Sequence, residues 1–569
     1  MTSIIEYSEK NISQLLGKKK YEKVLDLYDS YQPINEVDID KKTCNLSYVY
    51  YLMKNYETAK NVVLNVLIDR TQNIWPRLYY RLAKAYEGLQ NYDLMCESYD
   101  NMYKLLENEE RENNSSQHMQ DYFNQDVLFM QQWLIANGGV IHNLQIEYYD
   151  VDYRGMKIAT NVKPFEHLME IPWKCIISLE ESMKSNPYAR RIIDANIKLN
   201  SIHSYLAMEL LYIRHTETHH LLPYMRCLPK YFNNVPINFN IQELKNLEGS
   251  YAIIKIIQKL FILKIEYNAI IVVFPEGCPF TFADFVWART LVITRVYAIT
   301  KNGRQDTVMV PFADMANHET PPNTKWWFDN DSNNFIIEAN THLYNGDVIY
   351  ETYGNKCNYR YFVNYGFTVN NNKHEEVSLV FNNLLNEIID KFTQTIINYK
   401  NENALIGDVF EEMLDGYNNK EIINTFIDQI LVEKSVYQVG YEFNESVAKM
   451  FNDLRGIEKM NRGIEILVHK TVLLAICHRL DRFITTTKDD ELLLQQYDYN
   501  FNMHNIMVMC KEEKKVLYFW KELTMSIIEA LESKETIKVA FRKMNKKLAK
   551  WPGIKSFALY FRQLETVFT

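Results

Sequence analysis

The chain has neither paired cysteines nor a long hydrophobic run. Its eight cysteines are scattered over 569 residues without any CxxC spacing, the usual basis of zinc sites, so we predict no metal site and reduced thiols. The most apolar run, AIIVVF from Ala269 to Phe274, is too short to span a bilayer, and the N-terminus lacks the apolar core of a signal peptide. These absences predict a soluble protein in the cytoplasm, or also in the nucleus, with no membrane partner. We also expect a monomer.

The sequence also lacks an excess of basic residues. Lys and Arg total 63 against 72 Asp and Glu, which gives a formal net charge of -9. A nucleic-acid binder draws its affinity from a basic face that meets phosphates, so we predict no direct nucleic-acid partner. The length exceeds what one hydrophobic core organises, and several domains are expected.

The first hundred residues are repetitive. Tyr21, Tyr56 and Tyr92 each open an amphipathic segment, and they are spaced 35 and 36 residues apart. Small or aromatic residues, among them Ala59 and Gly88, fall where two helices of a hairpin would pack. The pattern resembles tetratricopeptide repeats, with an irregular helical extension as the alternative. We predict helical repeats over residues 1–106 that hold a protein partner, followed by a polar linker over residues 107–118.

The middle of the chain alternates between strand and helix patterns. A helix is predicted to stop at Gly138-Gly139, and short strand patterns such as LQIEYYDVDY, RGMKIAT and HLMEIP follow it. Residues from about 180 to 280 have helical periodicity, and strand patterns return in VMVPFADM, KWWFDN, NFIIEAN and VIYETYG. We therefore predict an α+β multidomain protein, with a β-rich domain over residues 119–375 and an all-α domain over residues 376–569.

The motifs that indicate a functional site lie between Val310 and Phe367. It contains VPFADMANHETPPN, then ETYGNKCN, then VNYGF. Asp314, Asn317 and His318 are polar residues among apolar ones at the end of a strand pattern, and buried polar groups need partners. Tyr353 ends a later strand pattern and is followed by a glycine that permits a tight turn, so its hydroxyl is presented where sites are commonly built.

These motifs, in this order, resemble a SET domain of the branch typified by the plant Rubisco large-subunit lysine methyltransferase. The segments WLIANGG, YRGMKIAT, LLPYMRCLPKYF and FADFVWARTLVITR match further landmarks of that branch. The resemblance covers residues 125 to 375, and the helical tail resembles the branch's substrate-binding domain. It implies an S-adenosylmethionine-dependent methyltransferase that acts on a side-chain nitrogen of a protein substrate.

The resemblance also implies roles for single residues. Tyr353 matches the catalytic tyrosine of the family. The positions that match its cofactor-binding residues are Asp152, Arg154, Gly155, Arg295, Asp314, Asn317, His318, Tyr353 and Phe367. The positions that match the substrate pocket are Tyr297, Ala313, Trp326 and Tyr365. Arg154 departs from the glycine or apolar residue that relatives carry, so we expect it to act through its backbone.

The target residue is left open between lysine and histidine. Relatives that methylate histidine in actin carry a Trp before the Asp-Met pair and an Asn two residues after the arginine, whereas this chain has Ala313 and Tyr297 there. We therefore expect lysine, with histidine as the alternative. A further alternative is a catalytically silent adaptor, although the cofactor-matching residues are present. His215, His219 and His220 have no carboxylate or cysteine at ligand spacing and predict no metal site.

Overall fold

The computed structural model describes residues 20–30, 36–68, 76–89, 117–148, 154–216, 219–382, 393–416, 435–496 and 500–568, with residues 94, 98, 101 and 387 besides. The chain divides into two compact units. The first comprises Met1–Ile141, Gln145–Gly155 and Tyr212–Leu228. The second comprises His142–Leu144, Met156–Leu211 and Pro229–Thr569.

The first unit begins with a series of packed helices. They are α2 (Tyr21–Ser30), α3 (Glu36–Leu52), α4 (Tyr56–Leu67) and α5 (Pro76–Gly88). Tyr21 and Tyr56 each begin a helix, and Asn55 caps α4 by accepting a hydrogen bond from the Thr58 N–H. Ala59 is fully buried, and a Cβ on Gly88 would overlap the Tyr56 ring, so small residues permit close helix packing. The tetratricopeptide character of these helices stays a prediction, and Tyr92 lies outside the described residues.

Two further described helices of the first unit, α7 (Gln117–Ala136) and α11 (Leu222–Cys227), pack together. Its described strand residues include β1 (Val140–Ile141) and most of β2 (Leu144–Tyr148). The predicted stop after α7 is confirmed, because Gly138 has a φ of 86° and the Gly139 N–H donates to the Leu134 carbonyl over 2.8 Å. The predicted linker is wrong at its end, since α7 already begins at Gln117.

The second unit holds the β-rich part of the chain in three small sheets. The first sheet includes β4 (His167–Pro172), β10 (Asn334–Ala339) and β9 (Thr324–Asp329), and the second consists of β5 (Ile177–Ser178), β7 (Arg304–Met309) and β6 (Val296–Lys301). The third includes β3 (Arg154–Ile158), β11 (Val348–Glu351) and β8 (Asn317–His318). Asn302 and Gly303 join β6 to β7 with φ angles of 50° and 76°, as a tight hairpin turn requires.

Helices separate the early strands of this unit from the later ones. They are α8 (Leu179–Ser185), α9 (Pro187–Asp194), α10 (His203–Arg214), η2 (Pro236–Asn238), α12 (Ile241–Lys245), α13 (Ala252–Ile271) and α14 (Phe282–Arg295), after η1 (Trp173–Cys175). Thr281 and Asp284 form a capping box that fixes where α14 begins, and Arg295 is its last residue.

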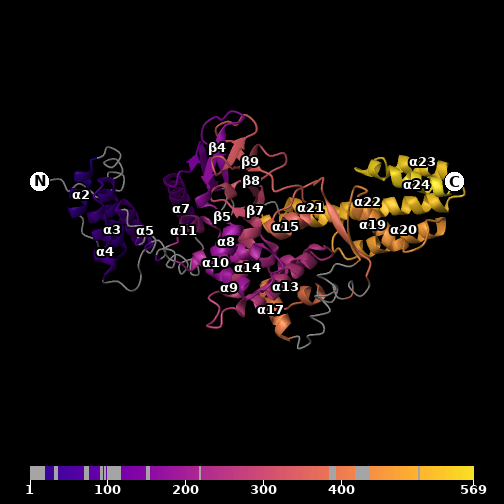
Figure 1. The fold of residues 1–569 in the computed structure, drawn as a ribbon, viewed down its shortest axis with the longest axis horizontal. Coiled ribbons are helices and arrows are strands. Elements are labelled where there is room, and N and C mark those ends of the chain that lie inside the picture. The colour runs from indigo at the N-terminus through magenta and orange to yellow at the C-terminus, as the bar shows by residue number, and fades with distance from the viewer. Residues whose placement is uncertain are drawn as a thin grey trace. The chain divides into compact units, whose positions relative to one another are not determined.

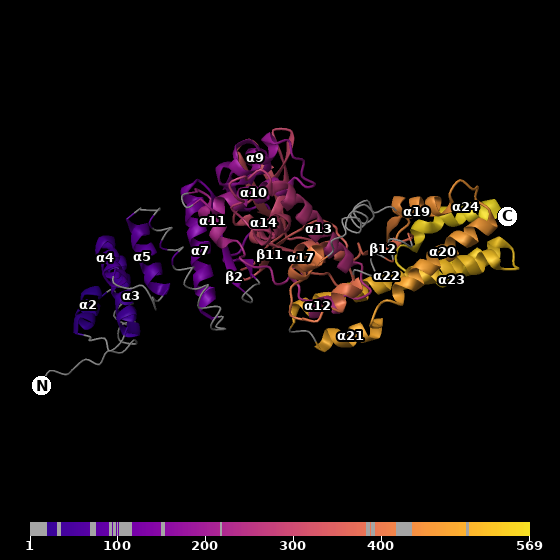
Figure 2. The same ribbon diagram turned by 90° about the horizontal axis from the view of Figure 1, so that it is seen from below.

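Where the structure describes it, the C-terminal part of the second unit is helical apart from one strand pair. Its helices are α15 (Asn358–Tyr365), α17 (Ile406–Gly416), α19 (Glu445–Arg455), α20 (Arg462–Leu480), α21 (Thr487–Gln496), α22 (Phe501–Glu532), α23 (Ile537–Leu548), η4 (Ile554–Phe557) and α24 (Ala558–Phe568). Figures 1 and 2 show α20 and α22 side by side, and the fully buried Trp520 of α22 donates its indole N–H to the Gly440 carbonyl over 2.7 Å.

The expectation of an all-α C-terminal domain needs one correction. Strand β12 (Glu376–Val380) pairs antiparallel with β13 (Val436–Gly440), which lies within the stretch predicted to be helical. The segment VYQVG has β-branched and aromatic residues, and it buries Tyr437 and Val439 alternately. Among the described helices, none is long and apolar enough to cross a membrane.

Candidate active site

The site is built where β8 meets β11. These two strands run parallel, so that Asn317 lies opposite Tyr350 and His318 opposite Glu351. The Glu319 N–H continues the ladder by donating to the Glu351 carbonyl over 3.0 Å. The pairing joins two motifs that are more than thirty residues apart in the chain, and it places the Asn-His pair beside the strand that leads to Tyr353.

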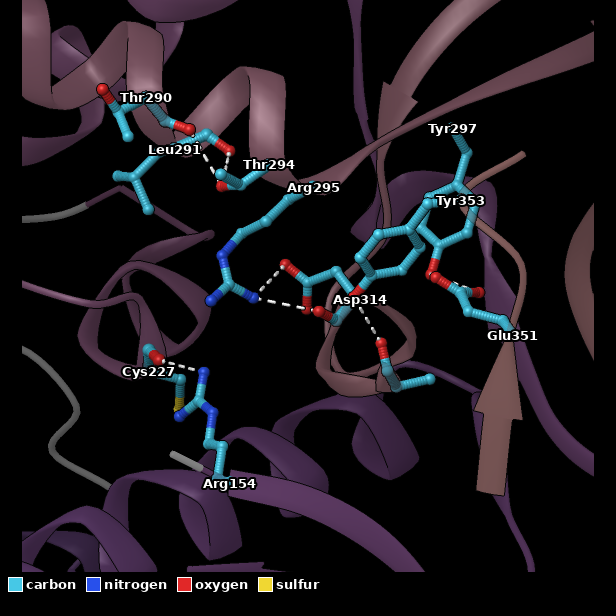
Figure 3. Close-up of polar contacts among 11 residues, drawn as sticks. Arg154, Cys227, Thr290, Leu291, Thr294, Arg295, Tyr297, Asp314, Glu351 and Tyr353 are labelled. Carbon is cyan, nitrogen blue, oxygen red and sulfur yellow. Dashed lines mark hydrogen bonds and ion pairs between the residues drawn. The ribbon is translucent and has the colours of Figure 1, made fainter. Parts of the chain in front are cut away.

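Tyr353 follows β11 by two residues rather than ending the strand. Its hydroxyl donates to the Ala316 carbonyl over 2.9 Å, and its backbone N–H donates to Nδ1 of His318 over 3.0 Å (Figure 3 shows the hydroxyl contact). The two rings stack with centroids 5.2 Å apart. Burial raises the pKa of the Tyr353 hydroxyl, so it stays protonated near neutral pH.

An aromatic cluster surrounds His318. It consists of His318, Tyr353, Tyr361, Tyr365 and Phe367, whose neighbouring ring centroids lie 5.0 to 6.4 Å apart. Tyr361 and Tyr365 lie on α15, and Phe367 follows the turn after this helix. That turn is made by Gly366, whose φ is 79° and on which a Cβ would lie 2.4 Å from the Asn234 carbonyl oxygen.

The cluster keeps His318 uncharged. Burial, helped by the nearby Lys356 ammonium, lowers the pKa of the imidazole to about 4. Since Nδ1 accepts the Tyr353 N–H, the neutral ring carries its proton on Nε2. Asn317 and His318 are both only partly buried, so this neutral polar pair is open to a ligand.

Arg295 and Asp314 form a second feature of the site. The Arg295 guanidinium, at the end of α14, donates to the Asp314 carbonyl over 3.0 Å and faces its carboxylate at 3.3 Å (Figure 3). Asp314 lies with Ala313 in the short helix η3 (Ala313–Met315), just after Phe312, a buried non-glycine residue with a φ of 69°. Such strained backbone persists only where surrounding contacts hold it, and Phe312 is fully buried with its carbonyl accepting the Met315 N–H over 3.1 Å.

Glu351 is a residue of this site that the sequence analysis did not select. Its carboxyl group is 5% exposed and accepts the Tyr297 hydroxyl, which lies 3.0 Å from both carboxyl oxygens (Figure 3). Burial raises the pKa of Glu351 well above its usual value, and the Asp314 carboxylate adds to this effect. A signal was available in the sequence, because strand alternation in VIYE places Glu351 on the same face as the buried Ile349.

The other predicted pocket residues gather near Tyr297. Trp326, on β9, packs edge-on against the Tyr297 ring with centroids 5.1 Å apart and stacks on Phe335 of β10 at 5.6 Å. Tyr365 stacks on Tyr353 with centroids 5.0 Å apart. The structure thus brings Tyr297, Trp326, Tyr353 and Tyr365 into one connected region of the second unit.

The predicted residues on the early strands belong largely to the first unit. The Arg154 side chain, which we expected to act through its backbone, donates from its guanidinium to the Cys227 carbonyl over 2.8 Å within that unit. Gly155 is buried on β3, and Asp152 lies outside the described residues. Among the residues that the structure describes, no group of three His, Cys, Asp or Glu side chains is arranged to hold a metal ion.

Comparison with known proteins agrees with this architecture. No family model matches the chain. The actin-histidine N-methyltransferases of Xenopus tropicalis and Homo sapiens are each 26% identical over 46% of this chain, and the match covers 45% and 44% of those proteins. The matched part of the chain therefore spans less than half the length of these curated relatives.

Two solved structures share the fold. They are the SET domain of LSMT bound to lysine and AdoHcy, with a TM-score of 0.53, and Rubisco LSMT bound to AdoMet, with a TM-score of 0.51. Each is 18% identical, and each match covers 99% of that chain and 77% or 76% of this one. The predicted SET-type α+β fold and the resemblance to this branch are confirmed.

Proposed function

We propose that this chain is an S-adenosylmethionine-dependent protein N-methyltransferase. The observation that carries the proposal is the parallel pairing of β8 with β11, which sets Asn317 and His318 beside the turn that holds Tyr353. The relatives named as methyltransferases and the solved SET domains that share the fold support the same reading.

The residues of the site fit the cofactor. S-adenosylmethionine, when bound, supplies a methyl group on a positively charged sulfonium, which aromatic faces attract and a charged histidine would repel. The aromatic cluster provides such faces, and His318 is neutral because its pKa is about 4. We assign cofactor binding to Asn317, His318 and Phe367, with Arg295 supporting them through Asp314.

The protein contributes mainly position and exclusion of water. Methyl transfer to nitrogen needs a neutral lone pair aligned with the reacting methyl group, so orientation supplies much of the rate. Tyr353 is fixed by the Ala316 carbonyl and by His318, which restrains its ring beside Tyr365. A lysine ammonium must lose a proton at a cost of about 5 kcal/mol at pH 7, and an aromatic, desolvated site lowers that cost.

Lysine is the target residue that we propose. Tyr297 and Ala313 occupy the positions where the resemblance to histidine-directed relatives would require Asn and Trp. In this structure the Tyr297 hydroxyl is bound to Glu351, and Ala313 is fully buried. Histidine is the second candidate, because the curated relatives are named actin-histidine methyltransferases.

Calorimetric titration of S-adenosylmethionine into the full chain tests the cofactor site. We expect measurable binding that falls at least tenfold in Asn317→Ala and is unchanged in Asn398→Ala, an exposed asparagine in the C-terminal part of the chain. No heat at several temperatures would favour the adaptor alternative. Incubation with actin and with lysine-containing peptides, followed by amino-acid analysis of the methylated product, then separates lysine from histidine.

A further inference from the structure

Glu351 is a buried acid whose nearest polar partner is a hydroxyl group rather than a cation. Both carboxyl oxygens lie 3.0 Å from the Tyr297 hydroxyl, which has one proton to donate between them. Among the described residues, no Lys, Arg or His nitrogen lies within ion-pair distance of this carboxyl group. Asp314, the neighbouring acid, differs because it faces the Arg295 guanidinium at 3.3 Å.

The position of Glu351 connects it to the proposed chemistry. It precedes Tyr353 by two residues. Burial raises the pKa of the Tyr297, Tyr353 and Tyr365 hydroxyls, and the Glu351 carboxylate, when ionised, raises each pKa further. The titratable groups that face Glu351 are Tyr297 on β6, Asp314 on η3, Tyr353 after β11 and Tyr365 on α15. Arg295 contacts Asp314, and His318 pairs with Glu351 across the two parallel strands.

We propose that Glu351, held in place by Tyr297, takes the proton from the ammonium group of the acceptor lysine. This inference rests on the proposed methyltransferase function and deepens it, because it names the residue that selects and prepares the acceptor. Glu351 is then a catalytic residue that touches the acceptor nitrogen, and Tyr297 is a positioning residue that acts through it.

Two proton movements accompany the step, one from Glu351 to solvent and one from the lysine ammonium to Glu351. In this proposal burial favours the neutral carboxyl group in the empty site, and its proton leaves to solvent as the lysine cation enters, because an adjacent positive charge favours the carboxylate. One N–H bond of the ammonium then breaks with its electron pair left on nitrogen, and an O–H bond forms on Glu351. The carboxyl group returns to its initial neutral form, and the neutral amine receives the methyl group.

Burial favours this transfer. A carboxylate and an ammonium are both penalised in a water-poor site, whereas the neutral acid and neutral amine are not. The same burial that raises the pKa of Glu351 therefore makes it a stronger proton acceptor than an exposed glutamate. An imidazole acceptor, whose pKa lies near 6.5, is largely neutral at pH 7 and needs no such group.

The test measures methyl transfer to Nα-acetyl-lysine amide across pH by the full chain and by Glu351→Gln. We expect transfer by the variant to fall about a hundredfold near pH 7 and to approach that of the unaltered chain near pH 10, where a substantial fraction of the amine is neutral in solution. Tyr297→Phe should move the rise in rate to higher pH, because the hydroxyl lowers the pKa of Glu351. An equal loss at every pH, or no loss at pH 7, would overturn the proposal.

A second readout is independent of turnover. Infrared difference spectra between the unaltered chain and Glu351→Gln, each with S-adenosylhomocysteine and the lysine amide bound, should show the carbonyl band of a protonated carboxyl group. Absence of that band would overturn the role of Glu351. Calorimetric binding of S-adenosylmethionine to Glu351→Gln separates these outcomes from failure of the proposed function, since the variant should retain the cofactor site.

Discussion

The site and the C-terminal helices both bury ionisable side chains, but they stabilise them differently. In the helices, Glu465 faces Arg455 at 2.5 Å and accepts the Tyr560 hydroxyl over 2.8 Å, and that hydroxyl lies 2.8 Å from Nε2 of His469. Glu465 therefore has both the Arg455 guanidinium and a hydrogen bond from the Tyr560 hydroxyl. Glu351 in the site has a similar tyrosine partner without the cation.

This difference separates a structural network from a reactive group. A buried acid paired with arginine is held in one ionisation state and contributes a fixed geometry. A buried acid with only a hydroxyl partner has a raised pKa and can change ionisation when a cation enters. Asp314 lies in the site but, like Glu465, has an arginine beside it, because its carboxylate faces the Arg295 guanidinium at 3.3 Å.

The largest expected effect is on catalysis. Tyr353→Phe removes the hydroxyl that donates to the Ala316 carbonyl while keeping the stacked ring. Methyl transfer should fall about a thousandfold, with affinity for S-adenosylmethionine nearly unchanged. Rate measurements with calorimetry on the same preparation check this, and full activity in the variant would remove Tyr353 from the mechanism.

The next largest effect is on stability, and it comes from removing the arginine partner of one buried acid in the site and of one in the C-terminal helices. Arg295→Met and Arg455→Met each leave a buried carboxylate without its cation, and each should lower the free energy of unfolding by about 3 kcal/mol in urea titrations. Arg295→Met should also weaken S-adenosylmethionine binding, whereas Arg455→Met should leave it intact. Equal losses of cofactor affinity would show that the two networks are not functionally distinct.

An exposed pair serves as the control for those two variants. Lys470 and Glu532 lie 2.8 Å apart, with about half of each side chain exposed to solvent. Lys470→Ala should change the free energy of unfolding by no more than about 0.5 kcal/mol, because exposed ion pairs gain little over hydration.

The pH dependence of the free energy of unfolding tests the buried network of the C-terminal helices, and the expected effect is smaller than that of the arginine variants. Burial lowers the pKa of His469 to about 3, below the unfolded value near 6.5, so the unfolded chain binds more protons between these values. The stabilisation that neutral His469 contributes is therefore fully present above about pH 6.5 and is lost as the pH falls toward 3. His469 should account for about 2 kcal/mol of the loss between pH 7 and pH 5. Urea titrations of His469→Gln should show a correspondingly smaller loss, and an unchanged slope would contradict the assignment.

Local chemistry explains which features could be predicted. Gly138 ends α7 because its left-handed backbone suits glycine, and the alternation in VIYE marks β11 without reference to the rest of the chain. The order of the Asn317-His318 and Tyr353 motifs likewise identified the fold. The roles assigned to single site residues remain predictions.

Long-range pairing explains what could not be predicted. The segment VYQVG became strand β13 because Glu376–Val380 offered it a partner some sixty residues away, although helical periodicity surrounds it. Tyr297 and Glu351 are 54 residues apart, and only the packing of β6 near β11 brings the hydroxyl to the carboxyl group. The sequence by itself therefore determined the motifs, the end of α7 and the SET-type fold. Only the tertiary structure decided which buried acid has a cation beside it, because ionisation depends on neighbours that chain order does not specify.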